Sequence, residues 1–267
     1  MRHSFQVEFI QLTNGHPAEF LAWDEAFLAE TEATGREFLW FWESSTPFVV
    51  LGYGQTLARE VLEVPCRERG IPILRRCSGG GAVVQGPGCL NYALSLHLPS
   101  HSALASVTST NQWIMNRQAQ SLSSRLKNQV VVRGHTDLAL TDSNGERKFS
   151  GNAQRRTRDA VLFHGTLLYQ FDLPWITTLL AHPTDQPAYR AQRSHQDFVT
   201  NLPLTQTELI NLLLAEWRPN QPVITLPTEH HQAALRRRYA HPEWHRSRQS
   251  VATSADPDPT KPFGINK

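Results

Sequence analysis

The chain has 267 residues and a formal net charge of +2; 19% of its residues are charged, 40% hydrophobic and 9% aromatic. This composition is typical of a globular protein and excludes a disordered chain, and the length fits one large domain or two small ones. The charge bias is too small to indicate a nucleic-acid or membrane-surface partner.

The cysteines and the apolar runs indicate a compartment. Cys66, Cys77 and Cys89 are too few for a disulfide framework and fit a reducing environment. No apolar run approaches the ~18 residues of a membrane span, and the first eight residues lack the apolar core of a signal peptide. We therefore expect a cytoplasmic protein.

The N-terminal half predicts one long helix and then short strands. Apolar residues recur every three or four positions over 17–34, with Pro17 in the first turn and Gly35 after the end, which predicts a helix. The apolar run 38–42 predicts a strand covered on both faces. Further predictions are strands over 47–52, 71–76 and 91–98 and helices over 56–69 and 102–126.

The C-terminal half is richer in strands. Strands are predicted over 130–132, 137–140, 148–150 and 160–171, with an Asn-Gly hairpin signal at 144–145, and a capped helix over 205–217. Hairpin-linked strands favour an α+β fold with a mixed, largely antiparallel central sheet flanked by helices over a doubly wound parallel sheet. The polar, Pro-rich residues 249–267 predict a flexible tail.

A glycine-rich segment is the first candidate site. Ser78 is followed by Gly79, Gly80 and Gly81, whose backbone allows close approach of a ligand, and Arg75 and Arg76 precede it. This segment predicts either an anion cradle or a hairpin turn with solvated arginines, because it matches neither the P-loop nor the dinucleotide fingerprint.

Two further segments have the same ambiguity. Lys148 lies beside a glycine-containing strand end, where its ammonium could meet a phosphate or carboxylate, or belong to a solvated basic hairpin. His164 lies between apolar residues and fits a hydrogen-bonded core histidine. His241 and His245 are four residues apart, as in a zinc-binding helix, but Pro242 between them is unfavourable in a helix interior. The spacing of the cysteines does not indicate a zinc site either.

Taken together, the motifs resemble those of the lipoate–protein ligase A family. The resemblance covers about residues 15–248 and rests on 49–55 (V-V-L-G-Y-G-Q), 75–83 (R-R-C-S-G-G-G-A-V), 137–138 (D-L), 147–153 (R-K-F-S-G-N-A), 164–168 (H-G-T-L-L) and 242–244 (P-E-W). It implies a class II biotin/lipoyl ligase-like catalytic domain over 1–248. A biotin substrate is disfavoured, because the G-R-G-R-x-G loop of biotin ligases is missing.

The resemblance also implies an activity. Family members activate lipoate or octanoate with ATP and Mg²⁺ as an acyl-adenylate and transfer the acyl group to a lysine of a lipoyl domain or glycine-cleavage H protein. Lys148 would be catalytic, the arginines would complement the phosphates, Asp137 would orient the nucleotide or the incoming amine, and His164 would wall the acyl slot. The residues implied to bind the acyl-adenylate are Arg75, Arg76, Ser78, Gly79, Gly80, Gly81, Ala82, Asn91, Asp137, Ser150, Gly151, Ala153, His164, Gly165 and Thr166.

Several departures keep alternatives open. Cys89 stands where many ligases have an asparagine, Thr136 replaces another, and no sequence resembling the further C-terminal domain of bacterial ligases follows. We therefore expect either a separate accessory subunit or a chain that only transfers. An ATP-independent transferase would need Cys77 or Cys89 as nucleophile. The simpler interpretation is that both cysteines are small buried residues that only pack in the core. A non-catalytic acyl-AMP-binding module is the third alternative, against which Lys148 argues.

Overall fold

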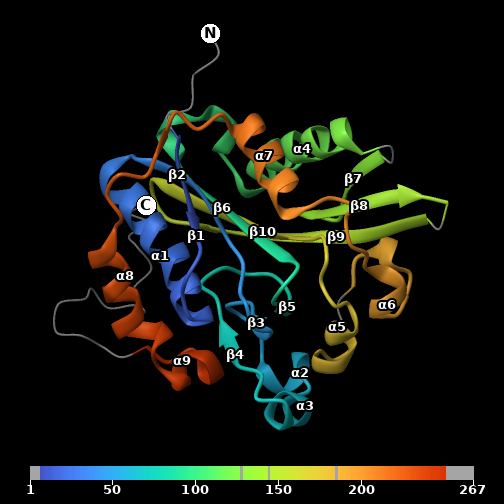
Figure 1. Ribbon diagram of the computed structural model, residues 1–267. Helices are drawn as coiled ribbons and strands as arrows, with labels where there is room; N and C mark the ends of the chain where they lie inside the picture. The colour runs from blue at the N-terminus through green and yellow to red at the C-terminus, as the bar shows by residue number, and fades with distance from the viewer. Residues whose placement is uncertain (1–6, 127–128, 144, 184–185, 251–267) are drawn as a thin grey trace.

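The centre of the molecule is a mixed sheet, seen edge-on in Figure 1. The computed structural model describes residues 7–126, 129–143, 145–183 and 186–250. Within these residues the strand order is β11-β1-β2-β6-β10-β9-β8-β7, and the strands are β1 (Val7–Leu12), β2 (Glu37–Trp42), β6 (Cys89–His97), β7 (Gln129–Arg133), β8 (Asp137–Asp142), β9 (Gly145–Arg156), β10 (Ala160–Leu168) and β11 (Gln221–Pro222). β1 runs parallel to β2 and β11, and the other neighbours are antiparallel. The predicted fold class is confirmed.

Strand β2 shows why the sheet is buried on both faces. Alternate side chains of a strand point to opposite faces. Phe38, Trp40 and Trp42 pack in the core beneath helix α1 (Pro17–Thr34), whereas Leu39 and Phe41 join the core on the other side of the sheet. The strand predicted from this apolar run, with cover on both faces, is confirmed.

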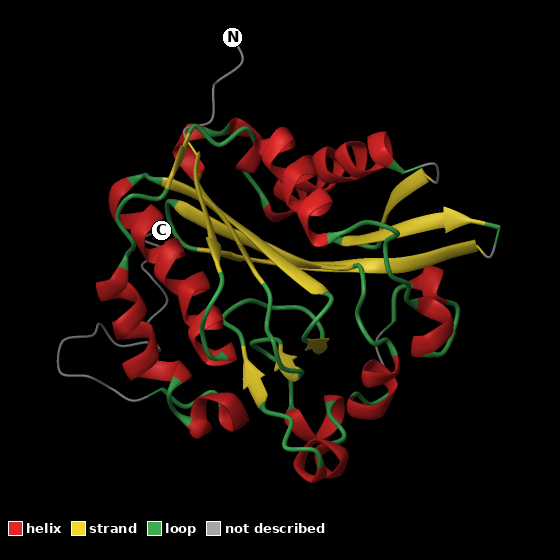
Figure 2. Ribbon diagram, viewed as in Figure 1, coloured by secondary structure: helices red, strands yellow, loops and turns green. Residues whose placement is uncertain are grey.

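Helices cover the two faces, as Figure 2 shows. One face packs against α1 and, outside it, the C-terminal helices α8 (Thr228–Ala234) and α9 (Pro242–Ser247), with the π-helical turn η4 (Leu235–Tyr239) between them. The other face packs against α4 (Val107–Arg125) and α7 (Gln206–Trp217). Short 3-10 turns are η1 (Leu98–Ser100), η2 (Ser102–Leu104) and η3 (Ala188–Arg190). No helix in the described ranges is both long and apolar enough to cross a membrane.

A small second sheet holds the glycine-rich segment. Its order is β4-β3-β5, with β3 (Phe48–Leu51) between β4 (Ile73–Arg75) and β5 (Val83–Gln85). The triple glycine lies in the loop from β4 to β5. This sheet has its own core with the short helices α2 (Leu57–Glu60), α3 (Glu63–Glu68), α5 (Pro174–Leu179) and α6 (His195–Phe198).

The differences from the predicted elements are local. The helix predicted over 56–69 is divided into α2 and α3 because Val61 is extended and pairs with Leu180. Helix α4 begins after the Ser106 N-cap instead of at residue 102. Strand β1 was not predicted, and β9 is longer than predicted. Of the predicted tail, residues 251–267 lie outside the described residues.

Candidate functional site

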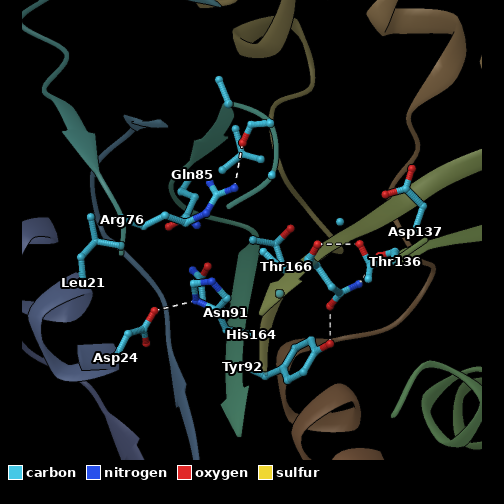
Figure 3. A pocket seen from close by; sticks show the side chains of 18 of the residues that line it. Leu21, Asp24, Arg76, Gln85, Asn91, Tyr92, Thr136, Asp137, His164 and Thr166 are labelled. Atoms are coloured by element: carbon cyan, nitrogen blue, oxygen red, sulfur yellow. Dashed lines mark hydrogen bonds and ion pairs between the residues drawn. The ribbon is translucent and has the colours of Figure 1, made fainter. Parts of the chain in front are cut away.

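A cavity of about 200 Å³ lies where the main sheet faces the glycine-rich loop and the start of α1. Figure 3 shows its side chains, with Leu21 and Asp24 at one side and Asp137 at the other. The lining residues come from both sheets, from α1 and from the loops before β5 and β8: Leu21, Asp24, Trp42, Arg76, Gly80, Gly81, Ala82, Val83, Gln85, Asn91, Tyr92, Thr136, Asp137, Lys148, Gly151, Asn152, Ala153, His164, Gly165 and Thr166. Of the residues implied by the resemblance, all but Arg75, Ser78, Gly79 and Ser150 line the cavity.

Lys148 reaches the cavity from β9 and is paired there. Its Nζ lies 2.7 Å from Oδ1 of Asp137, which opens the neighbouring strand β8. A Cβ added to Gly151 would lie 2.9 Å from that Nζ and 3.1 Å from Cε. Gly151 is therefore the position whose missing side chain makes room for the ammonium. A cation shared with one carboxylate can still turn towards an anionic ligand.

Tyr189, which belongs to none of the sequence motifs, holds the other oxygen of Asp137. Tyr189 lies in η3, and its hydroxyl donates to Oδ2 of Asp137 at 2.8 Å. Burial and the neighbouring carboxylate of Asp137 raise the pKa of Tyr189, so the hydroxyl stays protonated and remains a donor. No motif around position 189 signals this contact, because it joins segments 52 residues apart.

The glycine-rich loop is held from inside by Arg76. Its Nε donates to Oγ of Ser78 at 3.0 Å, and its terminal nitrogen donates to the carbonyls of Gly79 and Gly81 at 2.6 and 2.9 Å. Burial lowers the pKa of Arg76 to about 10, so the guanidinium keeps its charge at neutral pH. Gly80, between them, has a φ of +85°, which favours glycine.

Arg75 departs from its predicted role. It is 1% exposed, and its guanidinium donates to the carbonyls of Gly52, Tyr53 and Gln55 at 2.8–3.1 Å. The backbone N–H of Arg75 donates to Nδ1 of His245 at 3.1 Å. Arg75 therefore braces the loop after β3 against the C-terminal helix, and the geometry does not support the predicted contact with phosphates. Of the pair, only Arg76, which follows the end of β4, lines the cavity.

His164 belongs to a buried chain of hydrogen bonds. Its Nδ1 lies 2.6 Å from Oδ2 of Asp24 on α1, a residue that the sequence analysis missed, and its Nε2 lies 2.5 Å from Oγ of Ser78. Trp40 donates to the second oxygen of Asp24. His164 is thus both the hydrogen-bonded histidine expected from its surroundings and a cavity wall, whereas Ser78 lies behind it, 1% exposed.

A second polar chain lines the cavity floor. Tyr92 donates to Oδ1 of Asn152, whose amide nitrogen donates to the carbonyl of Thr136 at 2.8 Å. A Cβ on Gly165 would lie 1.7 Å from that same Oδ1. Gly165 is therefore needed for the close approach of Asn152, which explains a glycine in the middle of β10.

The thiols lie outside the cavity. Cys66, Cys77 and Cys89 are free and buried, and none lines the cavity. Burial raises the pKa of Cys77 to about 11 and that of Cys89 further, which disfavours the reactive thiolate that a thioester route needs. The described residues contain no group of three or more His, Cys, Asp or Glu side chains that could hold a metal.

A family comparison agrees with this geometry. The model of the lipoyl protein ligase A/B catalytic domain matches residues 16–213. The chain belongs to this family.

Solved structures show the same fold. A bipartite lipoate protein ligase from Thermoplasma acidophilum, described with its E2 lipoyl domain, superposes with a TM-score of 0.79 at 21% identity, over 94% of this chain and 99% of that one. A lipoate-protein ligase A bound with ATP gives 0.72 at 20% identity, over 91% and 98%. LipL1 from P. falciparum, in complex with lipoate, gives 0.68 at 18% identity, over 90% and 74%.

Proposed function

We propose that this chain is a lipoate–protein ligase-like enzyme that activates lipoate or octanoate with ATP and transfers the acyl group to a protein lysine. The observation that carries the proposal is the ammonium of Lys148, which lies beside Asp137 in the lining of a cavity that also includes Leu21 and Trp42. A lysine beside a carboxylate in such a cavity suits a reaction that joins two anions.

In the first step a carboxylate oxygen of the acid attacks the α-phosphorus of ATP, and pyrophosphate leaves with the electrons of the broken P–O bond. Both reactants are anions, and Mg²⁺ accompanies ATP as part of the substrate. Lys148 would hold the carboxylate and the α-phosphate oxygens together and offset their repulsion. The glycine-rich loop, with Gly80 and Gly81 at the cavity, would let the acyl-adenylate approach its backbone closely.

Apolar side chains in the cavity lining would contact the acyl chain. The large ones are Leu21, Trp42 and Val83. Burial of about seven methylenes at ~0.8 kcal/mol each would contribute about 5 to 6 kcal/mol to binding. This contribution is enough to raise the affinity for a medium-length acid above that for acetate by several orders of magnitude. The cavity would therefore select its substrate by chain length.

In the second step the amine of the acceptor lysine attacks the carbonyl carbon of the mixed anhydride. The C–O bond to AMP breaks, AMP leaves with the electron pair, and the proton of the amine passes to water. Asp137 would orient the incoming amine, and Lys148 would stabilise the oxygen anion that develops on the carbonyl.

The acceptor and an accessory subunit are also part of the proposal. We expect the acceptor to be a lipoyl domain or an H-type protein. The similar Thermoplasma structure is described as bipartite and with an E2 lipoyl domain. That description supports a lipoyl-domain acceptor, and it supports testing this chain both alone and with a second subunit. We expect no nucleic-acid or membrane partner.

The test is incubation with ATP, Mg²⁺, lipoate or octanoate and a panel of acceptor domains, read by mass shift, alongside acid-dependent ATP–pyrophosphate exchange. We expect Lys148→Ala to lose acyl transfer by 100-fold or more with an unchanged melting temperature. The matched control is Arg147→Ala, which removes the adjacent cation of β9; that cation pairs with Asp142 and does not line the cavity. Transfer from an acylated carrier protein without exchange would instead favour the ATP-independent transferase. Full activity in Lys148→Ala would contradict the catalytic role proposed for Lys148.

A further inference from the structure

We propose that Tyr189 is a positioning residue for this site: its hydroxyl holds one oxygen of Asp137 so that the other oxygen holds the Lys148 ammonium against Gly151. The consequence for acyl transfer rests on the proposed function. The consequence for the ammonium itself does not, and it can be measured without any substrate.

The contacts of Asp137 carry the first step. Its Oδ1 lies 2.7 Å from Nζ of Lys148, and its Oδ2 accepts from the Tyr189 hydroxyl at 2.8 Å. Because each oxygen has a different partner, the carboxylate cannot rotate about its Cβ–Cγ bond without breaking one of these contacts. The tyrosine therefore determines which way the carboxylate presents its free lone pairs to the ammonium.

The ring of Tyr189 is itself held in place. It packs against Phe198 with ring centroids 5.1 Å apart and an interplanar angle of 50°. Arg193 donates to the Tyr189 carbonyl at 2.9 Å and to the carbonyl of Glu146 on β9 at 2.7 Å. Glu146 precedes Lys148 by two residues, so the same arginine joins the tyrosine to the strand that bears the ammonium.

The backbone of Lys148 is also tied to this segment. The N–H of Thr200 donates to the Lys148 carbonyl at 2.9 Å, and Val199 forms a parallel bridge with Lys148. Residues 189–200 therefore contact Lys148 directly through its main chain and indirectly through Asp137. Two attachments, at the main chain and at the end of the side chain, fix the position of the ammonium better than either alone.

The experiment compares Tyr189→Phe with Tyr169→Phe. The first removes the hydroxyl and keeps the ring against Phe198; the second removes a comparable hydroxyl that donates to Glu43 at 2.9 Å and does not line the cavity. The chain has four lysines, at 127, 148, 261 and 267, so the ammonium signals of protein labelled with ¹³C and ¹⁵N at lysine can be assigned through the loss of one signal in Lys148→Arg.

Two readouts decide the inference. In Tyr189→Phe we expect the Lys148 ammonium protons to exchange with water about tenfold faster than in the wild-type chain, since a hydrogen bond to a charged group is lost. We also expect kcat for acyl transfer to fall at least about tenfold, while KM for the acid stays within about twofold of wild type. In Tyr169→Phe we expect both values to stay within about twofold of wild type. Melting temperatures confirm that both variants fold.

Wild-type ammonium exchange in Tyr189→Phe would overturn the inference, whatever reaction the protein catalyses. Faster exchange with an unchanged kcat would also overturn it, because the position of the ammonium would then not matter to transfer. If the wild-type chain acylates no acceptor, the proposed function fails on its own, and the exchange comparison still decides whether Tyr189 positions Lys148.

Discussion

Replacing Gly151 with alanine should displace the ammonium of Lys148 without unfolding the protein. The added Cβ would lie 2.9 Å from Nζ and 3.1 Å from Cε, and these atoms form the flexible end of a side chain, so they can move away at little cost. The backbone of Gly151 does not have a positive φ, so alanine fits its conformation. The substitution therefore acts on the position of one charged group.

The geometry sets the size of the effect. Ordinary van der Waals contact begins at 3.4 Å, so the ammonium must move by at least about 0.5 Å, and its 2.7 Å pair with Asp137 must lengthen or turn. Misplacement of a reacting group by 1 Å can cost about 100-fold in rate. We expect kcat to fall about 10- to 100-fold, which corresponds to about 1.4 to 2.7 kcal/mol of transition-state stabilisation.

The assay is ATP-dependent acylation of a lipoyl domain with saturating acid, read by mass shift, with thermal unfolding in parallel. Gly54→Ala is the matched control, because a Cβ there meets nothing within 4 Å. It should keep wild-type kcat. A wild-type kcat in Gly151→Ala would refute the reasoning that the rate depends on the position of the Lys148 ammonium. A large loss of stability would refute the reasoning that only a flexible side chain has to move.

Three further predictions concern the surroundings of the cavity. Cys77→Ala and Cys89→Ala should each keep most of the acyl transfer, since neither buried thiol lines the cavity; loss of transfer in either would restore the thioester route. Asp24→Asn should lower the free energy of unfolding by about 1.5–3 kcal/mol in urea titrations, because the carboxylate contacts both His164 and Trp40, and an amide keeps one acceptor oxygen where the carboxylate has two. Burial opposes ionisation of Glu25, but the attraction of Arg238, Arg155 and Arg237 together outweighs it, and the pKa of Glu25 is lowered below the usual 4.5. Its stabilisation is therefore present above pH 4.5 and is lost as the pH falls through the lower folded value, so Glu25→Gln should be less stable at pH 7 by about 3 kcal/mol and should lose less stability on acidification. An acid-induced loss as large as that of the wild-type chain would contradict the last prediction.

The elements that could be predicted are those whose pattern is local. Helix α1 is predicted with both ends, because proline at its start and Gly35 after its end are local signals, and Gly35 has the left-handed conformation that ends a helix. Strand β2 is predicted because the apolar run 38–42 is too short for a helix and fits a strand covered on both faces, and all the residues of β2 are buried. The split between α2 and α3 could not be predicted, since it depends on the pairing of Val61 with Leu180, 119 residues later in the chain.

The candidate site divides in the same way. The glycine-rich loop, Lys148 and His164 belong to short motifs and could be identified from the sequence. Asp24 could not, because it lies on a helix whose other buried residues are mostly apolar, and it becomes informative only once His164 is seen 2.6 Å away. Tyr189 has no motif at all. Partners that a side chain acquires through tertiary contacts leave no periodic or spacing signal in the sequence.

The two adjacent arginines show how far a signature motif can be taken as evidence of contact with a ligand. Arg76 faces the cavity and holds the loop that would cradle the acyl-adenylate, whereas Arg75 points away and binds backbone carbonyls. The carbonyl of Arg75 also accepts from Nε1 of Trp244, and its N–H donates to His245, so the segment 242–244 that completes the family pattern meets the segment 75–83 in space. A motif residue can thus be required because it joins the C-terminal helix to the loop behind the site. The contacts of each side chain separate the two roles, and substitution of Arg75 should therefore act on folding before it acts on substrate binding.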